Sequence, residues 1–370
     1  MSEAVYAETP MVQLLTPDGQ RVEHPDYPLA ISDDEIAALY RDLVLVRRLD
    51  SEAIALQRQG ELGLWASALG QEAAQVGAGR ALAPQDMCFP SYREHGIAWC
   101  RGVDPLALLG NWRGTDFGGF DPHAFNFANY TIVIGSQTLH AAGYAMGVVR
   151  DGAIGTGDAT TDTAVLACFG DGATSQGDVH EAFVWASAEN LPLVFFLQNN
   201  QWAISAPVAV QSRAPLYLRA QGYGMRGVRV DGNDVLATLA VTRRALEDAR
   251  NGDGPSLVEA YTYRLNPHTT NDDTRRYRTA DKAEEWRQRD PLARVRAYLE
   301  VEADIASSFF ADLEDEAQTL AERLRAGARL LPEPTADSVF AHVLTEPTAD
   351  LREQQEEFAD FLESVRAAVS

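Results

Sequence analysis

One stretch of about forty residues, 163–202, constrains the fold more than any other part of the chain. Its first apolar, β-branched segment ends at Asp171, an amphipathic segment follows, and a second apolar segment ends at Asn200. A periodicity that changes from strand to helix and back predicts a βαβ unit with two parallel strands. Because such connections are right-handed in nearly all folds, the two strands are expected to lie side by side with their carboxyl ends together. Asp171 and Asn200 are then expected at the edge where α/β sheets bind ligands.

The chemistry of these two side chains predicts the ligand. Neighbouring strands lie about 4.8 Å apart, and Mg²⁺ holds its oxygen ligands at about 2.0–2.1 Å, so side chains on adjacent strand ends can share one ion. One carboxylate and one amide oxygen suit Mg²⁺ that also binds a phosphate, and they do not suit zinc or copper. Gly172 and Ala173 are expected to open the helix that follows, where backbone N–H groups can bind an anion. The stretch therefore predicts a magnesium–diphosphate site.

A nicotinamide-binding unit is the competing interpretation, because the Gly-Asp-Gly segment that starts at Gly170 also follows a strand and precedes a helix. The dinucleotide fingerprint needs a third glycine and an acidic residue near the end of the next strand. Ser175 stands in the first of these places, and Asn199 and Asn200 stand in the second. The pattern disfavours a dinucleotide site, and a nicotinamide-dependent oxidoreductase stays open only as an alternative for a binding experiment to exclude.

Composition limits the classes of function. The chain has 370 residues, 46% of them hydrophobic, which is enough for a large core in one α/β domain. A formal net charge of −23 argues against nucleic acid, whose phosphates would be repelled. Cys88, Cys100 and Cys168 lack paired spacing, which is typical of free thiols in the cytoplasm. Because the N-terminus lacks the features of a secretory signal and no apolar run approaches the roughly twenty residues that span a bilayer, we expect a cytoplasmic protein without a membrane partner.

The pattern along the chain predicts three regions. Residues 1–33 are expected to form an extended arm, and residues 34–300 an open, mostly parallel, doubly wound α/β sheet with helices on both faces. Ser32 and Glu35 form a capping-box pattern at the start of the first helix of this domain. Residues 301–370 predict a helical C-terminal region packed on the same domain.

Three segments outside the central unit carry further candidate groups. Tyr92 and Arg93 place an aromatic ring beside a guanidinium that can bind phosphate through two hydrogen bonds, although such a pair alone is usual on a surface. Residues 132–137 predict a short apolar strand that ends in glycine. Residues 264–278 follow a strand and combine four arginines, two acids and one histidine, which favours a lid ordered by ion pairs and a bound anion.

In this order, the segments resemble those of the α subunit of the E1 component of 2-oxo acid dehydrogenase complexes, the branched-chain and pyruvate group. The resemblance runs from about residue 40 to residue 300. Its motifs are RQGELGLWASALGQEA, FPSYREHG, IVIGSQTLHAAG, GDGATSQGDVHEA, QNNQWAIS and YRLNPHTTNDDTRRYR. The central unit also matches the thiamine diphosphate signature, GDG followed by 26 residues and NN. The resemblance implies a thiamine diphosphate-binding fold.

Carried over residue by residue, the resemblance implies a site for thiamine diphosphate and Mg²⁺. The metal ligands would be Asp171, Asn200 and the backbone carbonyl of Trp202, where the family usually has Tyr or Phe. The implied cofactor-binding residues are Tyr92, Arg93, Ile132, Ile134, Asp171, Gly172, Ala173, Asn200 and His268. His268 is also the implied catalytic residue in acyl transfer to lipoyl, and Leu64 would face the substrate side chain.

The resemblance also implies which groups come from other chains. The glutamate that meets the pyrimidine ring of the cofactor belongs to the E1 β subunit in this family, so an α₂β₂ heterotetramer is expected, with lipoylated E2 acyltransferase as the acyl acceptor. The expected reaction is oxidative decarboxylation of a 2-oxo acid. The segment TTNDD, 269–273, favours a branched-chain substrate over pyruvate or an acetoin-type substrate. A noncatalytic subunit that only binds the cofactor is the alternative from another class.

Overall fold

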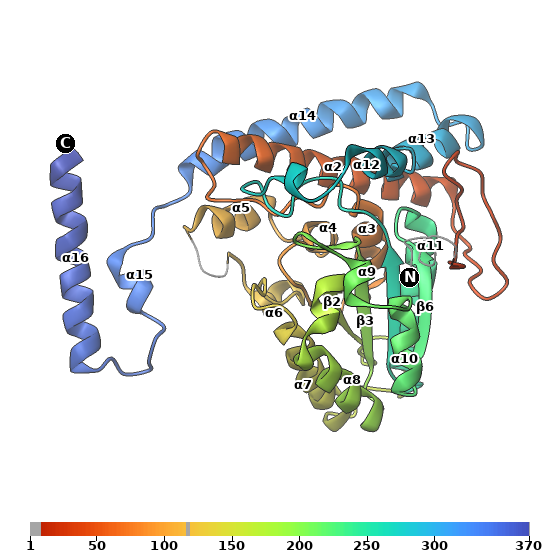
Figure 1. Cartoon of the computed structure of the whole chain (residues 1–370), viewed down its shortest axis with the longest axis horizontal. Helices are drawn as coiled ribbons and strands as arrows, with labels where there is room; N and C mark the ends of the chain where they lie inside the picture. Colours follow the sequence, from red (N-terminus) through yellow and green to blue (C-terminus); the bar gives the residue numbers. More distant parts are fainter. Residues whose placement is uncertain (1–8, 116–118, 370) are drawn as a thin grey trace.

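The computed structural model describes residues 9–115 and 119–369. Its main strands are β1 Met87–Phe89, β2 Val165–Gly170, β3 Leu193–Asn199, β6 Arg226–Asp231 and β7 Ser256–Tyr261. They form one parallel sheet in the order β1-β2-β3-β7-β6 at the centre of the molecule (Figure 1). β2 and β3 are neighbours in this sheet, with Val165 opposite Leu193, so the predicted βαβ unit is confirmed.

Helices make up most of the remaining chain. They are α2 Asp33–Arg58, α3 Glu72–Ala81, α4 His95–Cys100, α5 Pro105–Arg113, α6 Pro122–Phe125, α7 Ser136–Arg150, α8 Gly177–Ala188, α9 Val208–Gln211, α10 Arg219–Gly222, α11 Val235–Arg250, α12 Ala280–Arg287, α13 Pro291–Val301, α14 Ser307–Leu330, α15 Ala336–Phe340 and α16 Ala349–Val369. A short hairpin, β4 Trp202–Ala203 and β5 Ala206–Pro207, follows β3. α2 begins with the predicted capping box of Ser32 and Glu35. In the described part of the chain, no helix is both long and apolar enough to cross a membrane.

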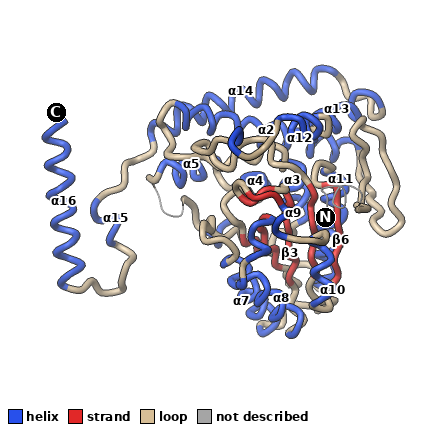
Figure 2. Tube along the Cα trace, in the orientation of Figure 1, coloured by secondary structure: helices blue, strands red, loops and turns tan. Residues whose placement is uncertain are grey.

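Helices cover both faces of the sheet (Figure 2). On one face α7 and α8 pack together over Val165, Ala167 and Phe169 of β2. On the other face α3 and α11 pack together, and α11 packs over Val194 and Phe196 of β3. Because successive side chains of a strand point to opposite faces, a strand covered on both sides has a continuous apolar sequence. The predicted doubly wound α/β fold is confirmed.

The segment 132–137 does not form the predicted strand. Its first residues form a loop, and the chain then enters α7 through Gly135, which has a φ of +91°. Ile132, Val133 and Ile134 are 62%, 71% and 37% exposed. Apolar, β-branched residues form strands where a neighbouring strand and a covering surface are present. None of the strands in the described chain pairs with this segment, so its strand propensity has no partner to act on.

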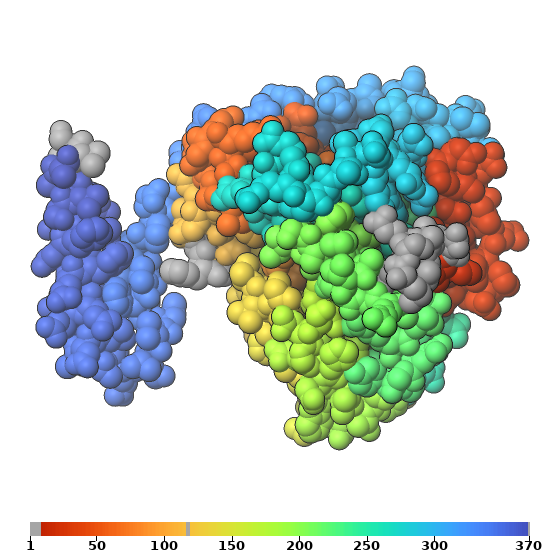
Figure 3. All heavy atoms as spheres, in the orientation of Figure 1, coloured from red at the N-terminus to blue at the C-terminus, as the bar shows by residue number. Residues whose placement is uncertain are grey.

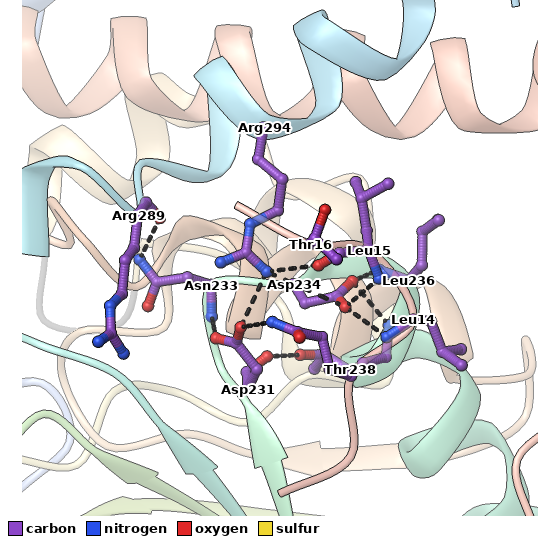
Figure 4. Close-up of polar contacts among 12 residues, drawn as sticks. Leu14, Leu15, Thr16, Asp231, Asn233, Asp234, Leu236, Thr238, Arg289 and Arg294 are labelled. Carbon is purple, nitrogen blue, oxygen red and sulfur yellow. Dashed lines mark hydrogen bonds and ion pairs between the residues drawn. The ribbon is translucent and has the colours of Figure 1, made fainter. Parts of the chain in front are cut away.

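The N-terminal arm docks at the end of β6 (Figure 4). The backbone N–H groups of Leu14 and Leu15 both donate to Oδ2 of Asp234, at 2.7 and 2.6 Å. Oδ1 of Asp234 accepts two N–H groups from the first turn of α11, each at 3.0 Å. Arg294 of α13 donates to the carbonyl of Leu15 at 2.9 Å and to Asp231 at 2.8 Å. One buried carboxylate thus holds the arm and caps a helix.

The C-terminal region divides into two parts. α14 packs along α2 and buries Leu313, Leu320 and Leu324. α15 and α16 pack against each other, with Phe340 and Phe358 in ring contact, and they stand apart from the rest of the chain (Figures 1 and 3). Every described side chain of α16 is half-buried or exposed. The expectation that the whole region packs on the α/β domain is therefore wrong for α15 and α16.

Candidate active site

A cavity of about 510 Å³ opens at the carboxyl ends of β2 and β3. All the residues predicted to contact cofactor, metal or substrate line it: Leu64, Tyr92, Arg93, Ile132, Ile134, Asp171, Gly172, Ala173, Asn200, Trp202 and His268. Its volume is in the range of pockets that hold small molecules and cofactors. The structure therefore gathers residues from distant segments at the edge of the sheet where α/β folds bind ligands.

Asp171 follows β2 directly and is almost fully enclosed. The side chain is 1% exposed, and burial raises the pKa of its carboxyl to about 6. Gln211 of α9, a neutral donor, contacts Oδ2 at 3.2 Å, and the positive charge of Arg264 lowers this pKa by less than burial raises it. A buried carboxylate is stable in its charged form only when a cation or several donors compensate the lost hydration. A divalent cation at this position would supply that compensation.

Two further oxygens near Asp171 have the chemistry of magnesium ligands. Within the described residues, no group of three or more His, Cys, Asp or Glu is placed to hold a metal ion, so a metal here needs amide and carbonyl oxygens. Nδ2 of Asn200 donates to Gln71 at 2.6 Å, which leaves Oδ1 as the atom available to a cation. The Trp202 carbonyl accepts a hydrogen bond from Arg264 at 3.1 Å, which uses one of its two lone pairs. This set suits Mg²⁺ whose remaining ligands are water and phosphate oxygens.

The turn after β2 differs from the prediction. Gly172 and Ala173 do not open α8; they lie in a 3₁₀ helix, η1 Asp171–Ser175, and α8 follows it. Thr174 tightens this turn by donating its hydroxyl to the carbonyl of Asp171 at 2.7 Å. A Cβ atom on Gly172 would lie 2.8 Å from Cβ of Ala203, so the contact with the β4–β5 hairpin requires glycine. The first N–H groups of a 3₁₀ helix have no partner within it, so those of Gly172 and Ala173 can still bind an anion.

Two guanidinium groups meet at His268: Arg93 lines the cavity, and Arg264 contacts the lining residues Trp202 and His268. Arg93 is buried and donates to the carbonyls of Ser67 and His268, at 2.6 and 2.8 Å. Arg264 is fully buried, and burial together with the charge of Arg93 lowers its pKa to about 10. Both guanidiniums contact Nδ1 of His268 at 3.3 Å. Two buried cations this close to one another favour a bound anion between or beside them.

His268 lies between these arginines and Tyr92. Burial, followed by the charges of Arg93 and Arg264, lowers the pKa of His268 to about 3, so its ring is neutral at pH 7. The Tyr92 hydroxyl is 3.4 Å from Nε2. The backbone N–H of His268 donates to Asp272 at 3.0 Å, which orders this part of the 264–278 loop. A neutral imidazole can either donate or accept a proton in the cavity.

Apolar side chains form the outer part of the cavity. Leu64 and Trp112 line the cavity, and both come from segments outside the central βαβ unit. Ile132, Ile134 and Ile204 also line the cavity, and all three are exposed. The site thus has a charged and polar interior and an exposed apolar rim.

Several lining residues were not predicted from the sequence. They are Gln71, Ser91, Glu94, Trp112, Gln137, Gly170, Gln176, Gln198, Ala203, Ile204 and Thr269. Gln71 and Glu94 stand inside two of the quoted motifs, LGQEA and SYREHG, yet only the folded chain brings them together.

Comparison with known proteins identifies the class to which this fold and site belong. Residues 40–324 match the family model described as the dehydrogenase E1 component. The chain is 44% identical over 347 residues to a 3-methyl-2-oxobutanoate dehydrogenase subunit alpha of Mycobacterium tuberculosis, which covers 94% of this chain and 92% of that protein. It is 36% identical to a pyruvate dehydrogenase E1 component subunit alpha of Acholeplasma laidlawii, over 90% of this chain and 95% of that protein. It is 32% identical to a mitochondrial 2-oxoisovalerate dehydrogenase subunit alpha 2 of Arabidopsis thaliana, over 96% of this chain and 76% of that protein.

The chain therefore belongs to the dehydrogenase E1 component family, which uses thiamine diphosphate. Within that family it is an α subunit of the branched-chain 2-oxo acid and pyruvate dehydrogenase group. Such a subunit is part of an oxidoreductase, and its designation as α implies a β partner.

Proposed function

We propose that this chain binds thiamine diphosphate with Mg²⁺ and, with a β subunit, catalyses oxidative decarboxylation of a branched-chain 2-oxo acid. The observation that carries the proposal is the convergence of all the predicted site residues on one cavity at the ends of β2 and β3. When bound, the cofactor supplies the carbon nucleophile and the electron sink for loss of CO₂. The residues of this chain supply binding, orientation and charge.

The metal and the diphosphate occupy the interior of the cavity in this proposal. Asp171, Asn200 and the Trp202 carbonyl hold Mg²⁺, which neutralises the buried carboxylate. Tyr92 and Arg93 would bind the diphosphate, and Gly172 and Ala173 would contribute backbone N–H groups. Arg264, which the sequence-based prediction did not include among the site residues, adds a second buried positive charge.

His268 acts at the reacting end of the site. Its neutral ring is contacted by Arg93 and Arg264, and its backbone N–H is held by Asp272, so the ring could move a proton during acyl transfer to the lipoyl group of E2. Ile132 and Ile134 contact the pyrimidine end of the cofactor, and Leu64 contacts the substrate side chain.

The carboxylate that assists the pyrimidine ring comes from the partner chain in this proposal. Among the residues that the structure describes, Glu94 and Asp171 are the acidic side chains that line the cavity. Asp171 is assigned to the metal, and Glu94 already accepts hydrogen bonds from Ser91, Gln198 and the backbone. The exposed apolar loop at Ile132 is a suitable contact for a β subunit, whose glutamate would enter from that side. We propose an α₂β₂ assembly on this basis.

The choice of substrate rests on the similarity to the two branched-chain relatives and on the TTNDD segment of the lid. Pyruvate and an acetoin-type substrate are the other candidates within the same reaction class. An assay of the co-expressed α and β chains with 3-methyl-2-oxobutanoate, pyruvate and acetoin is expected to give the highest kcat/KM for the first.

Calorimetry with thiamine diphosphate and Mg²⁺ tests the cofactor assignment. Tight binding by the α–β assembly, lost in Asp171→Ala, is the expected result. Binding of NADH without any response to thiamine diphosphate would contradict the proposal. Tight cofactor binding without decarboxylation of any 2-oxo acid would instead favour a noncatalytic, cofactor-binding subunit.

A further inference from the structure

A chain of buried amide side chains connects Glu94 to the proposed metal ligand Asn200. Nε2 of Gln198 donates to Glu94 at 2.7 Å. Oε1 of Gln198 accepts from the amide groups of Gln71 and Gln75, both at 3.1 Å. Oε1 of Gln71 then accepts from Nδ2 of Asn200 at 2.6 Å. Each of the five side chains is at most 6% exposed, so water is largely excluded from these bonds.

The groups at the ends of this hydrogen-bonded series determine which way each amide side chain points its oxygen and its NH₂ group. Glu94 as a carboxylate only accepts hydrogen bonds, and it also accepts from the Ser91 hydroxyl at 2.8 Å, so the NH₂ group of Gln198 must face it. A second anchor is the backbone N–H of Gly96, which only donates and which contacts Oε1 of Gln75 at 2.8 Å. The NH₂ group of Gln75 must therefore point toward the oxygen of Gln198. Both anchors require the same orientation of Gln198.

The orientation of Gln198 also determines the orientation of the proposed metal ligand Asn200. Because Gln198 presents its oxygen to Gln71, Gln71 presents its own oxygen to Asn200. Asn200 must then turn its NH₂ group toward Gln71 and its Oδ1 away from it. The reversed amide would point two N–H donors at a cation, whereas Mg²⁺ binds only oxygen here. The other bond that orients this amide, from the Trp202 N–H to Oδ1, is longer, at 3.2 Å.

We propose that Gln71 is a positioning residue for magnesium: its carbonyl, oriented through Gln198 by Glu94 and Gln75, holds Asn200 with its oxygen toward the metal. This inference rests on the proposed magnesium site and adds to it the residues that orient its amide ligand. Groups that orient metal ligands typically contribute a factor of about 10–100 to metal affinity.

The test measures the affinity of the co-expressed α–β assembly for Mg²⁺, by calorimetry at saturating thiamine diphosphate, with Mn²⁺ electron paramagnetic resonance as a second readout. Gln71→Met preserves side-chain length and removes the hydrogen bond to Asn200. The Kd for Mg²⁺ is expected to rise about 10–100-fold. The matched control is Gln85→Met, which removes two donated hydrogen bonds to the carbonyls of Ala159 and Asp162, outside the site, and is expected to leave this Kd unchanged.

A double-mutant cycle with Asn200→Asp separates orientation from general structural damage. An aspartate presents oxygen in either orientation, so Gln71→Met is expected to change the Kd of the Asn200→Asp protein by less than about threefold. Equal fold-changes in both backgrounds would overturn the proposal, because a structural role of Gln71 does not depend on whether residue 200 is an amide.

A second variant covers the case in which Gln71→Met unfolds the chain. Glu94→Gln preserves the shape of the side chain and removes the carboxylate that only accepts hydrogen bonds. Because Gln75 still orients Gln198, this variant is expected to raise the Kd for Mg²⁺ by less than Gln71→Met does. An unchanged Kd in folded Glu94→Gln and Gln71→Met proteins would refute the positioning role. Failure of the unaltered assembly to bind Mg²⁺ with thiamine diphosphate would instead refute the proposed function itself.

Discussion

The shared carboxylate of Asp234 provides a quantitative test of how the N-terminal arm is attached. In Asp234→Ala, α11 loses its N-cap, which costs about 1 kcal/mol. The N–H groups of Leu14 and Leu15 also lose their acceptor, and a buried N–H without a partner costs about 1–3 kcal/mol. The three losses together are about 3–7 kcal/mol. Arg294 retains Asp231 at 2.8 Å, so the ion pair contributes little to the difference.

A second variant separates the loss at the arm from the loss at the helix cap, and a third variant serves as a control. In Asp234→Asn the one remaining oxygen can cap α11, and the NH₂ group then faces the donors of Leu14 and Leu15, so the arm is released while the helix remains. Asp104→Ala is the control, because Asp104 caps α5 through the N–H of Leu106 and pairs with the exposed Arg323 of α14, but does not contact the N-terminal arm. It is expected to cost about 1 kcal/mol.

Hydrogen exchange of the amides of Leu14 and Leu15, read by NMR or mass spectrometry, measures the release of the arm. The two lost acceptor bonds of the arm cost about 2–6 kcal/mol, which corresponds to protection factors that fall by at least about 30-fold, since 1.36 kcal/mol is a factor of ten. Faster tryptic cleavage after Arg21, an exposed residue of the arm, is the second readout. Unchanged protection at both leucines in Asp234→Asn, or an equal loss in the Asp104→Ala control, would show that the arm is held by other contacts.

Three more variants test the site and its surroundings. Gly172→Ala is expected to weaken binding of Mg²⁺ with thiamine diphosphate about tenfold or more by calorimetry, because the new Cβ overpacks against Ala203 at 2.8 Å, and Ala203→Gly in the same chain should restore much of the loss. Ile132→Asp is expected to leave the circular dichroism of the isolated chain unchanged but to reduce co-purification with the β subunit, and normal assembly would argue against this loop as the contact. Burial lowers the pKa of His95 to about 3, so the unfolded chain gains a proton below pH 6.5 that the folded chain does not. The contribution of the neutral His95 to the free energy of unfolding is fully present above pH 6.5 and decreases as the pH falls toward 3, by ~1.4 kcal/mol per pH unit or ~2 kcal/mol at pH 5. In urea unfolding, His95→Gln should reduce this dependence of stability on pH. An equal pH dependence in His95→Gln and the unaltered chain would contradict the prediction.

The local sequence was sufficient to predict the central βαβ unit of this protein. The strands β2 and β3 are apolar throughout because both faces of the sheet are covered, and each ends abruptly in polar residues, so periodicity alone located the βαβ unit and placed Asp171 and Asn200 at one edge. The capping box at Ser32 was predicted for the same reason, since its contacts lie within one turn of helix. Interactions of this kind depend on neighbours a few residues apart, and the sequence contains them directly.

Tertiary structure decided everything that depends on distant neighbours. Ile132 and its apolar neighbours have strand propensity but no adjacent strand, so they form an exposed loop. Arg93 and His268 are 175 residues apart in sequence, and only the fold places them in contact and suppresses the charge of the imidazole. The orientation of the Asn200 amide likewise depends on buried partners from other segments of the chain. A sequence states which groups are present, but the burial and hydrogen-bond partners that determine their charge and direction exist only after the segments pack together.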